Sequence, residues 1–329
     1  MFNNSEKVPF WFMRQAGRYM PEYHQVFNKG KNFLDVCYNP ELAFEITLQP
    51  IKKFDMSAAI MFSDILLLPH ALGCNVNFIK NVGPIIEPLT TELNFIDYQK
   101  LEEKLQPIFK LLRKLRKNLT AEKDLIGFAG SPFTVLAYLI EGGSSKTFSK
   151  VKEIAYKNEE KFAFFINRIT EATTFYLNKQ IENGANIVQL FDSWSGILSA
   201  EEFNRWVIKP TQKIVSNLIG AKVIGFPKGA GCLYIDYVKQ TGVDAVSVDY
   251  SVPLEWIRDN LQPLTIVQGN LDPFLLTYNK ERALKQAENI FSVLGNNHFI
   301  FNLGHGINKE TPVEHVEALV EKIKCWKRI

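Results

Sequence analysis

Hydrophobic residues along the chain follow two patterns, short apolar runs and longer amphipathic stretches. Apolar residues recur every three or four positions in Leu101–Leu119 and Lys161–Glu182, with charged residues between them, and this spacing predicts two helices. The short runs end in Gly, Asp, Ser, Asn or Lys, which is typical of a strand that leads into a loop. Eight such runs are predicted as strands: Val8–Met13, Ala58–Ile65, Leu125–Ala129, Ile187–Asp192, Lys222–Phe226, Ala245–Val248, Thr265–Gln268 and Phe299–Leu303.

Helix starts of two kinds lie between the predicted strands. In the first kind a capping side chain precedes a proline, whose missing N–H would be unpaired in the first turn anyway. In the second kind, the capping box, a hydroxyl residue stands three positions before a glutamate. The first kind occurs at Asn39-Pro40 and Asp272-Pro273, and the second at Ser199 with Glu202 and at Thr311 with Glu314.

Strands that alternate with helices along the whole chain predict an α/β protein with a parallel sheet. No linker rich in Pro, Gly or Ser divides the chain, so we expect residues 1–329 to form a single domain. Eight strands in this order favour one (β/α)8 TIM-type barrel, and an open doubly wound sheet is the alternative. The long stretch between the second and third predicted strands is expected to hold an extra helix or a lid.

Composition and charge narrow the choice of partner and compartment. The 329 residues are 46% hydrophobic and carry a formal net charge of +3, with basic residues spread along the chain. This distribution argues against nucleic acid or a membrane surface as the main partner. No apolar run approaches the roughly 20 residues that span a bilayer, and the first ten residues lack a signal-peptide pattern. Cys37, Cys74, Cys232 and Cys325 stand far apart and fit neither a disulfide framework nor a zinc site, so we expect a cytoplasmic protein.

Polar residues follow the predicted strands, at the edge of the sheet where α/β barrels carry their active sites. Arg14 and Arg18 are two of nine arginines and lie within five residues of each other on a glycine-containing turn. Each guanidinium group can bind a carboxylate through two parallel hydrogen bonds, which predicts anion recognition; structural ion pairs are the alternative. The same edge is expected to carry Ser131, Ser193, Lys228, Asp249, Asn270 and Asp272.

Two further residues at this edge are candidates for chemistry. Asp64 follows an apolar strand, where a carboxylate needs a cationic or hydrogen-bonding partner. A helix cap or a partner for one of the arginines is the alternative interpretation of Asp64. His305 stands between two glycines at the end of the last predicted strand, so its ring can face a pocket; a structural histidine is the alternative.

Several motifs for nucleotides, metals and nucleophiles are incomplete. Gly142–Thr147 reads GGSSKT and lacks the glycines of a P-loop, and Gly229–Gly231 lacks the rest of a dinucleotide fingerprint. No His/Cys spacing typical of zinc occurs, and no GxSxG sequence marks a nucleophilic serine. The sequence therefore predicts anion binding without a metal or a nucleotide.

Longer motifs resemble one known family. PFWFMRQAGRYMPEY at Pro9–Tyr23 and GFAGSPFTVLAYLIEGG at Gly127–Gly143 closely resemble the two signatures of uroporphyrinogen decarboxylases. MFSDILLLPHALG, IVQLFDSWSG, GFPKGAG, QGNLDP and FNLGHGI follow in the family's order, and the resemblance runs from about Val8 to the C-terminus.

The resemblance implies a (β/α) barrel that acts as a homodimer without a cofactor or a metal. The implied substrate is uroporphyrinogen, a tetrapyrrole with four acetate and four propionate arms, whose acetates lose CO2 to give coproporphyrinogen for haem synthesis. By the same resemblance Asp64, Arg14 and Tyr138 are catalytic, with Asp64 meeting the pyrrole N–H groups. The implied substrate-binding residues are Arg14, Gln15, Ala16, Gly17, Arg18, Asp64, Tyr138, Ser193 and His305, with Phe62, Ile65 and Phe191 as apolar walls.

One departure from the family and two rival interpretations remain. Many relatives carry an arginine where this chain has Phe27, so we expect Lys29 or Lys31 to hold the corresponding carboxylate arm. Corrinoid or coenzyme M methyltransferases share the fold and bind zinc through His and Cys; Cys232 lies near such a position, but Ala230 stands where the histidine would be. A tetrapyrrole-binding protein without activity is the other rival.

Overall fold

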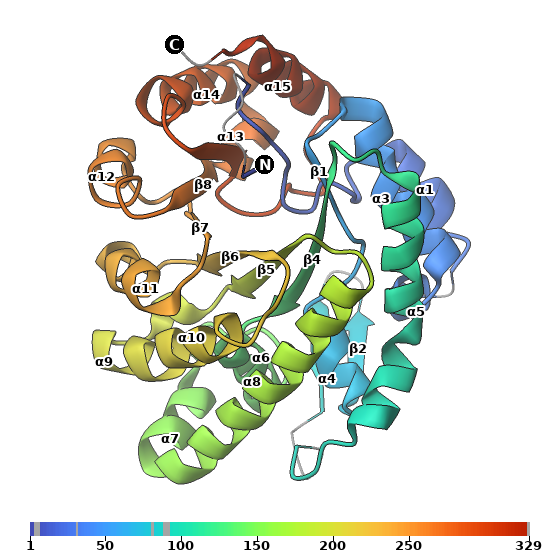
Figure 1. Ribbon diagram of the computed structural model, residues 1–329, viewed down its shortest axis with the longest axis vertical. Coiled ribbons are helices and arrows are strands. Elements are labelled where there is room, and N and C mark those ends of the chain that lie inside the picture. Colours follow the sequence, from blue (N-terminus) through green and yellow to red (C-terminus); the bar gives the residue numbers. More distant parts are fainter. Residues whose placement is uncertain (3–6, 31, 80–81, 88–92, 328–329) are drawn as a thin grey trace.

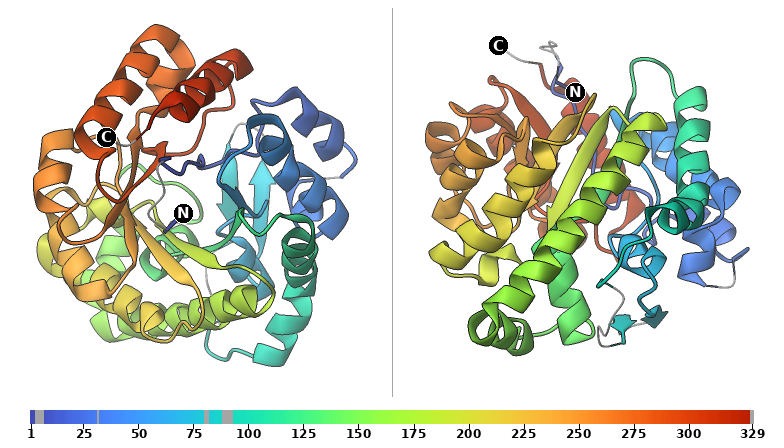
Figure 2. Two further views of the ribbon diagram at one scale, coloured as in Figure 1. Left: turned by 45° about the horizontal axis from the view of Figure 1, so that its top comes forward. Right: turned by 60° about the horizontal axis from the view of Figure 1, so that its bottom comes forward.

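Parallel strands form the centre of the molecule, and helices surround them (Figures 1 and 2). The structure is a computed structural model that describes residues 1–2, 7–30, 32–79, 82–87 and 93–327. A curled sheet of seven parallel strands has the order β1-β4-β5-β6-β7-β8-β9. Its strands are β1 (Ala58–Ile60), β4 (Asp124–Gly130), β5 (Ile187–Asp192), β6 (Lys222–Pro227), β7 (Ala245–Ser247), β8 (Ile266–Leu271) and β9 (Phe299–Leu303).

Helices follow the strands in the alternation that the sequence predicts. The stretches predicted as helices at Leu101–Leu119 and Lys161–Glu182 are α5 (Tyr98–Asn118) and α8 (Glu159–Glu182). The remaining helices are α1 (Pro21–Phe27), α2 (Phe33–Cys37), α3 (Pro40–Phe54), α4 (Leu67–Ala71), α6 (Pro132–Glu141), α7 (Ser149–Lys157), η1 (Ser195–Ile197), α9 (Ala200–Phe203), η2 (Asn204–Ile208), α10 (Lys209–Val215), η3 (Gly231–Leu233), α11 (Tyr234–Thr241), α12 (Leu254–Asn260), α13 (Pro273–Tyr278), α14 (Lys280–Leu294) and α15 (Val313–Cys325).

The predicted caps are correct at three of four helix starts. Asn39 and Asp272 accept backbone N–H groups at the starts of α3 and α13, and Ser199 does so at α9. The capping box predicted at Thr311 is wrong, because α15 begins after Pro312 without a side-chain cap. The Thr311 hydroxyl instead lies 2.8 Å from the hydroxyl of Thr277 in α13, in a buried contact between two elements that the local sequence cannot encode.

Val8–Met13, the first of the eight predicted strands along the chain, does not form a strand. Its only ladder contact is an isolated parallel bridge between Phe10 and Phe301 of β9. The segment nevertheless lies between β9 and β1: the Phe301 N–H donates to the Pro9 carbonyl at 2.9 Å, and the Ser57 N–H donates to the Phe10 carbonyl at 2.9 Å. The described chain therefore has a seven-stranded curled sheet with an irregular segment in the remaining gap, and an eight-stranded barrel is not shown.

The long stretch between β1 and β4 contains more than the predicted extra helix or lid. Helix α4 is followed by an antiparallel pair, β2 (Val76–Ile79) and β3 (Gly83–Ile86), which the sequence pattern did not predict. Burial alternates along the four residues of β2, but the sequence pattern does not, because the apolar Ile79 occupies an exposed position and is 48% exposed. An antiparallel bridge between Ile85 and Gly143 places the pair beside the carboxyl end of α6.

Side chains inside the curl join strands that are not neighbours. The Trp11 indole N–H donates to the Gln268 side chain of β8 at 2.8 Å, and Gln268 donates to Gln189 of β5 at 3.1 Å. All three side chains are buried, and only the inner face of a curled sheet allows such contacts between distant strands. Polar residues in this core are stabilised because they hydrogen-bond one another.

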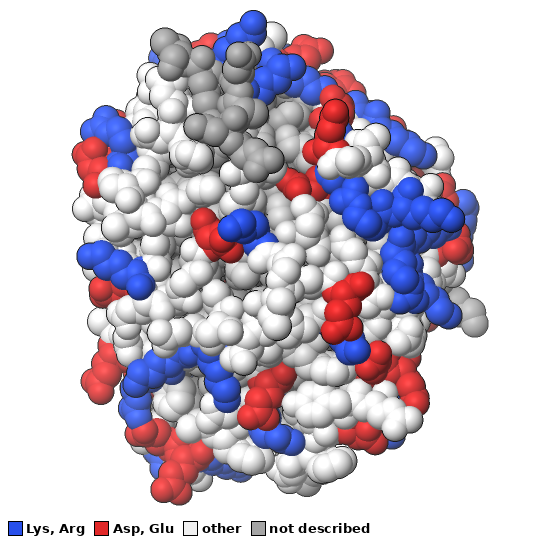
Figure 3. All heavy atoms as spheres, viewed as in Figure 1, with Lys and Arg blue, Asp and Glu red and all other residues white. Residues whose placement is uncertain are grey.

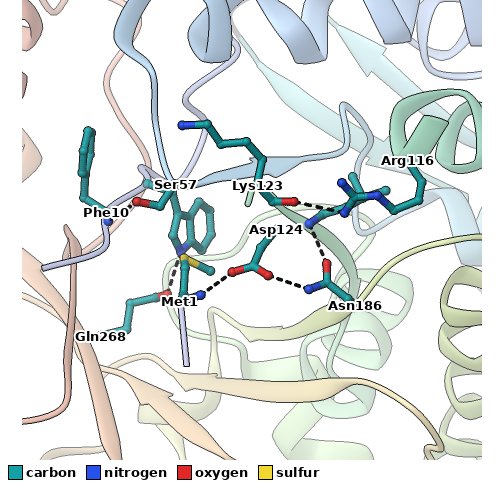
Figure 4. A network of polar contacts seen from close by, with 10 residues as sticks. Met1, Phe10, Ser57, Arg116, Lys123, Asp124, Asn186 and Gln268 are labelled. Atoms are coloured by element: carbon teal, nitrogen blue, oxygen red, sulfur yellow. Dashed lines mark hydrogen bonds and ion pairs between the residues drawn. The ribbon is translucent and has the colours of Figure 1, made fainter. Parts of the chain in front are cut away.

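A polar network lies at the amino-terminal ends of the strands (Figure 4). Asp124, at the start of β4, pairs with the amino group of Met1 and accepts from the Asn186 side chain at 2.5 Å. Asn186 in turn accepts the Leu125 N–H at 2.7 Å. Because all strands of the sheet are parallel, the candidate chemistry at their carboxyl ends lies at the opposite edge.

Candidate functional site

The turn after Val8–Met13 carries both candidate arginines at the carboxyl edge of the sheet. Arg14 has a φ of +60°, in the left-handed region that few residues other than glycine adopt. Its side chain runs across Gly306: a Cβ atom on Gly306 would lie 2.5 Å from the Arg14 Cδ. A glycine at 306 is therefore what allows the arginine from the first segment to reach the loop after β9.

Gln15, in the middle of this turn, anchors the turn to the core. Gln15 is fully buried, and its side chain accepts the Phe12 N–H at 3.1 Å and donates to the Ala58 carbonyl at 3.0 Å. The structure thus places the Gln15 side chain in the core, while Ala16 and Gly17 are half-buried. Arg14 and Arg18 are exposed on either side of them.

Asp64 lies four residues after the end of β1, next to the Arg14 charge. Its Oδ1 accepts the Leu66 N–H at 2.9 Å, in a tight turn that leads into α4. Burial raises the pKa of Asp64, while the Leu66 N–H and the Arg14 guanidinium lower it. The carboxyl group is therefore desolvated but faces a cation, the setting in which a carboxylate interacts strongly with charge that develops nearby.

Tyr138, on α6, faces the same two charged groups. Burial raises the pKa of its hydroxyl, the Trp194 indole lowers it, and of the two charges Asp64 raises it and Arg14 lowers it. The Tyr138 ring meets the Trp194 ring edge-on, with 5.9 Å between centroids. The Tyr138 hydroxyl thus remains protonated at neutral pH and can donate a hydrogen bond.

His305, between Gly304 and Gly306, is flanked by positive charge. The pKa of its imidazole is lowered to about 3, chiefly by burial and also by the Arg14 and Lys228 charges, while Asp249 acts in the opposite direction. The imidazole is therefore neutral at physiological pH, and it can donate only one hydrogen bond at a time.

Ser193 is half-buried directly after β5, next to Asp192, the last residue of that strand. Asp192 is buried, and its pKa is raised to about 7 because desolvation outweighs the hydrogen bonding from Thr134, which lowers it. The Thr134 hydroxyl donates to Asp192 at 2.5 Å and accepts the Trp194 N–H at 3.1 Å. Asp192 thereby supports the loop of Ser193 and Trp194. The sequence indicates only that Asp192 ends a strand, whereas its contact with Thr134 depends on the packing of α6 against β5.

The predicted apolar residues are positioned by the loops around Asp64. Phe62 is buried against Tyr23, with 5.9 Å between ring centroids. Phe191 is half-buried and meets Phe128 edge-on, and Ile65 packs against Gly130.

Some arginines of the described chain pair with carboxylates and others do not. Arg168, Arg205 and Arg258 each pair with a carboxylate. Neither Arg14 nor Arg18 forms an ion pair with any described residue. Figure 3 shows basic and acidic side chains spread over one face of the molecule. The unpaired Arg14 guanidinium near Asp64 and His305 is suited to a ligand that carries a carboxylate.

Phe27, which stands where many relatives carry an arginine, takes part in aromatic packing. Phe27 stacks on Tyr23, with 5.2 Å between ring centroids. Lys29 forms an exposed ion pair with Glu45 of α3 at 3.6 Å, and Lys31 lies outside the described residues.

Two cavities of the described chain lie away from Arg14, Asp64, Tyr138 and His305. One, of about 320 Å³, lies between α5 and α8 and is lined by Tyr98 and Phe175. The other, of about 340 Å³, lies beside the loop after β7 and includes Tyr250, Asn270 and Asp272. The Arg14 side chain instead lies against Gly306, and its charge acts on the neighbouring His305.

The described part of the chain lacks two further kinds of feature. Within it, no group of three or more His, Cys, Asp or Glu side chains is arranged to hold a metal ion. None of its helices combines the length and apolar character needed to cross a bilayer. The four cysteines, all in described segments, form no disulfide, and Cys232 is exposed.

Sequence comparison finds extensive similarity to one family. The family described as Uroporphyrinogen decarboxylase (URO-D) matches residues 3–326. A protein of Neorickettsia sennetsu named uroporphyrinogen decarboxylase is 51% identical over 320 residues, covering 97% of this chain and 98% of its own. A protein of the same name from Rickettsia canadensis is 46% identical and covers 99% of this chain and 97% of its own.

Structural comparison supports the fold at greater distance. A methyltransferase from Methanosarcina mazei superimposes with a TM-score of 0.82 at 20% identity, covering 97% of this chain and 94% of its own. At that identity the likeness concerns the fold alone.

Proposed function

The chain belongs to the uroporphyrinogen decarboxylase family, and on that premise we propose that it converts uroporphyrinogen III to coproporphyrinogen III with release of four CO2. The observation that carries the proposal is the meeting of unpaired Arg14 with desolvated Asp64, Tyr138 and His305 at one edge of the sheet. Such an edge combines anion binding with a carboxylate placed for electrostatic stabilisation. The family model matches residues 3–326, and the Neorickettsia sennetsu relative is 51% identical over 97% of this chain.

Asp64 is the proposed electrostatic centre of the reaction. Protonation of a pyrrole ring carbon makes the ring cationic, and the electrons of the breaking C–CO2 bond flow into that cation. A second proton on the methylene carbon, balanced by loss of the first from the ring, gives the methyl group. For each arm the net change is a carboxylate and one proton giving a methyl group and CO2. The Asp64 carboxylate stabilises the cation and accepts the pyrrole N–H groups.

The surrounding groups orient the macrocycle. Arg14 and Arg18 bind carboxylate arms through paired hydrogen bonds, with the Gln15–Gly17 backbone as the turn between them. Tyr138 donates a hydrogen bond to the reacting acetate, because its raised pKa keeps the hydroxyl protonated. Ser193 and neutral His305 contact the remaining arms, so binding energy is converted into orientation.

The finer features of the architecture are also proposed. The segment Val8–Met13 takes the place of an eighth strand, so that residues 1–329 form one barrel domain. Its hydrogen bonds to β9 and to Ser57 support this.

We expect a cytoplasmic homodimer. Phe274 and Tyr278 stack with 6.3 Å between centroids while remaining exposed, and they are the proposed apolar centre of the contact with a second copy. Sedimentation of Tyr278→Ser tests this: an unchanged dimer or a monomeric parent protein would refute it.

Turnover is tested with enzymatically made uroporphyrinogen under anaerobic conditions. Chromatography should reveal products with seven, six, five and finally four carboxyl groups. The matched control for the Asp64→Ala variant is Asp259→Ala, because Asp259 is an exposed aspartate on α12 that pairs with Arg258. Substrate that stays at eight carboxyl groups with wild-type protein would refute the proposed activity and favour a binding protein.

A further inference from the structure

Lys228 is the first residue after β6, and its backbone is held in place from two sides. Its N–H donates to the Asp192 carbonyl at 3.1 Å, and its own carbonyl accepts the Gly196 N–H at 3.2 Å and the Ser195 hydroxyl at 3.2 Å. The next N–H, that of Gly229, donates to Asp249 at 2.7 Å. The Cα of Lys228 is therefore anchored at the carboxyl edge, beside the loop that carries Ser193.

The half-buried side chain of Lys228 has no ion-pair partner among the described residues. The neighbouring carboxylate, Asp249, is already occupied by other donors. Besides Gly229 it accepts the Tyr234 hydroxyl at 3.1 Å and, from Ser251, the N–H at 3.0 Å and the hydroxyl at 2.5 Å. Asp249 thus serves to tie the loops after β6 and β7 together.

The Lys228 charge acts on His305, a residue of the candidate site. Together with Arg14 it lowers the pKa of His305, after burial the largest causes of that shift. Phe226 of β6, two residues before Lys228, meets the His305 ring edge-on with 6.2 Å between centroids, so the end of β6 lies beside His305. Arg14 and Lys228, which follow Val8–Met13 and β6, therefore bring two positive charges near one neutral imidazole. Like charges held together in a partly buried place destabilise the free protein unless an anion joins them.

We propose that Lys228 is a further substrate-binding residue, which with His305 binds one carboxylate arm of the macrocycle. The inference rests on the proposed function, because that substrate supplies the carboxylates. An ammonium group acts as a point charge on a flexible stem, so it can follow an arm as the macrocycle turns between successive decarboxylations, whereas a planar guanidinium holds one orientation. Lys228 thus complements the more rigid arginine turn.

The test compares Lys228→Met with Lys222→Met. Lys222 lies at the other end of the same strand, is exposed, and pairs with Asp244 at 2.7 Å, so it is a matched control. We expect Lys228→Met to raise KM about tenfold, the change that loss of about 1.4 kcal/mol of binding produces, with kcat within threefold. Lys228→Arg should recover most of the affinity, and Lys222→Met should match wild type.

Two further measurements separate binding from folding and from chemistry. Lys228→Met should leave the thermal midpoint equal to or above that of wild type, because it removes an uncompensated cation; a lower midpoint together with raised KM would indicate a structural lysine. Anaerobic binding of coproporphyrinogen, measured by tryptophan fluorescence, should weaken about tenfold in the same variant. Unchanged KM and unchanged binding would overturn the assignment of Lys228.

The outcomes also distinguish the two proposals. Lys228-dependent binding by a wild-type protein that never releases CO2 would support the role of Lys228 and refute the proposed reaction. Normal turnover with affinity independent of Lys228 would do the reverse. A wild-type protein that neither binds nor reacts would refute both.

Discussion

Replacing Asp192 by asparagine should change how the stability of the protein depends on pH. The wild-type carboxyl group is buried, and its pKa is raised from 3.8 to about 7, chiefly by desolvation. Between these values the folded state binds more protons than the unfolded state, so wild-type stability falls as pH rises through that window. An amide does not ionise, and it can still accept the Thr134 hydroxyl at the retained oxygen.

The magnitude follows from the width of the window. Inside this window the stability difference changes by about 1.4 kcal/mol for each pH unit, and the interval from pH 5 to pH 7 lies wholly within it. The free energy of unfolding of Asp192→Asn relative to wild type should therefore grow by about 2.7 kcal/mol from pH 5 to pH 8. One Asp192 oxygen has no partner, so the new NH2 group is also unsatisfied there. That cost is the same at both pH values and cancels in the comparison.

Urea unfolding of both proteins at pH 5 and pH 8 measures the difference directly. Asp259→Asn is the control, because the pKa of this exposed carboxyl group is lowered by hydrogen bonding to Arg258. Stability from Asp259 is present above its unfolded pKa and is lost only as pH falls, so the control should show no gain between pH 5 and pH 8. Parallel wild-type and Asp192→Asn stabilities, within about 0.5 kcal/mol, would refute the desolvated carboxyl group at Asp192.

Four further outcomes are expected. Asp64→Ala should lower kcat by roughly 10²–10³, the usual effect of losing a preorganised electrostatic partner, and activity within twofold of wild type would remove Asp64 from the mechanism. Arg18→Lys should raise KM because a point charge replaces a planar fork, whereas an unaltered KM would indicate a structural arginine. Gly306→Ala should displace Arg14, whose Cδ would lie 2.5 Å from the new Cβ, and raise KM; kinetics identical to wild type would show that Arg14 does not need this path. Dialysis against a strong chelator should leave turnover intact, and a loss that zinc restores would contradict metal-independent chemistry.

Local sequence was sufficient for elements whose stability comes from their own pattern. The 3.6-residue period of α5 and α8, and the caps at Asn39 and Asp272, are properties of neighbouring residues. Seven of the eight predicted strands also form, because apolar runs that enter a parallel sheet are buried on both faces and read as short continuous stretches. The motifs around Arg14, Asp64 and His305 identified the family before any spatial arrangement was known.

Tertiary structure decided what depends on partners distant in the chain. Whether Val8–Met13 becomes a strand depends on the spacing of β9 and β1, which a single apolar run does not contain. Gln15 carries the same polar group as a binding residue, but its burial against the Ala58 carbonyl makes it a support. The charge state of His305 and the unpaired cation at Lys228 follow from desolvation and from like charges brought together by the curl of the sheet. A linear sequence specifies which groups are present; only folding determines which of them lose water and which lack a counterion.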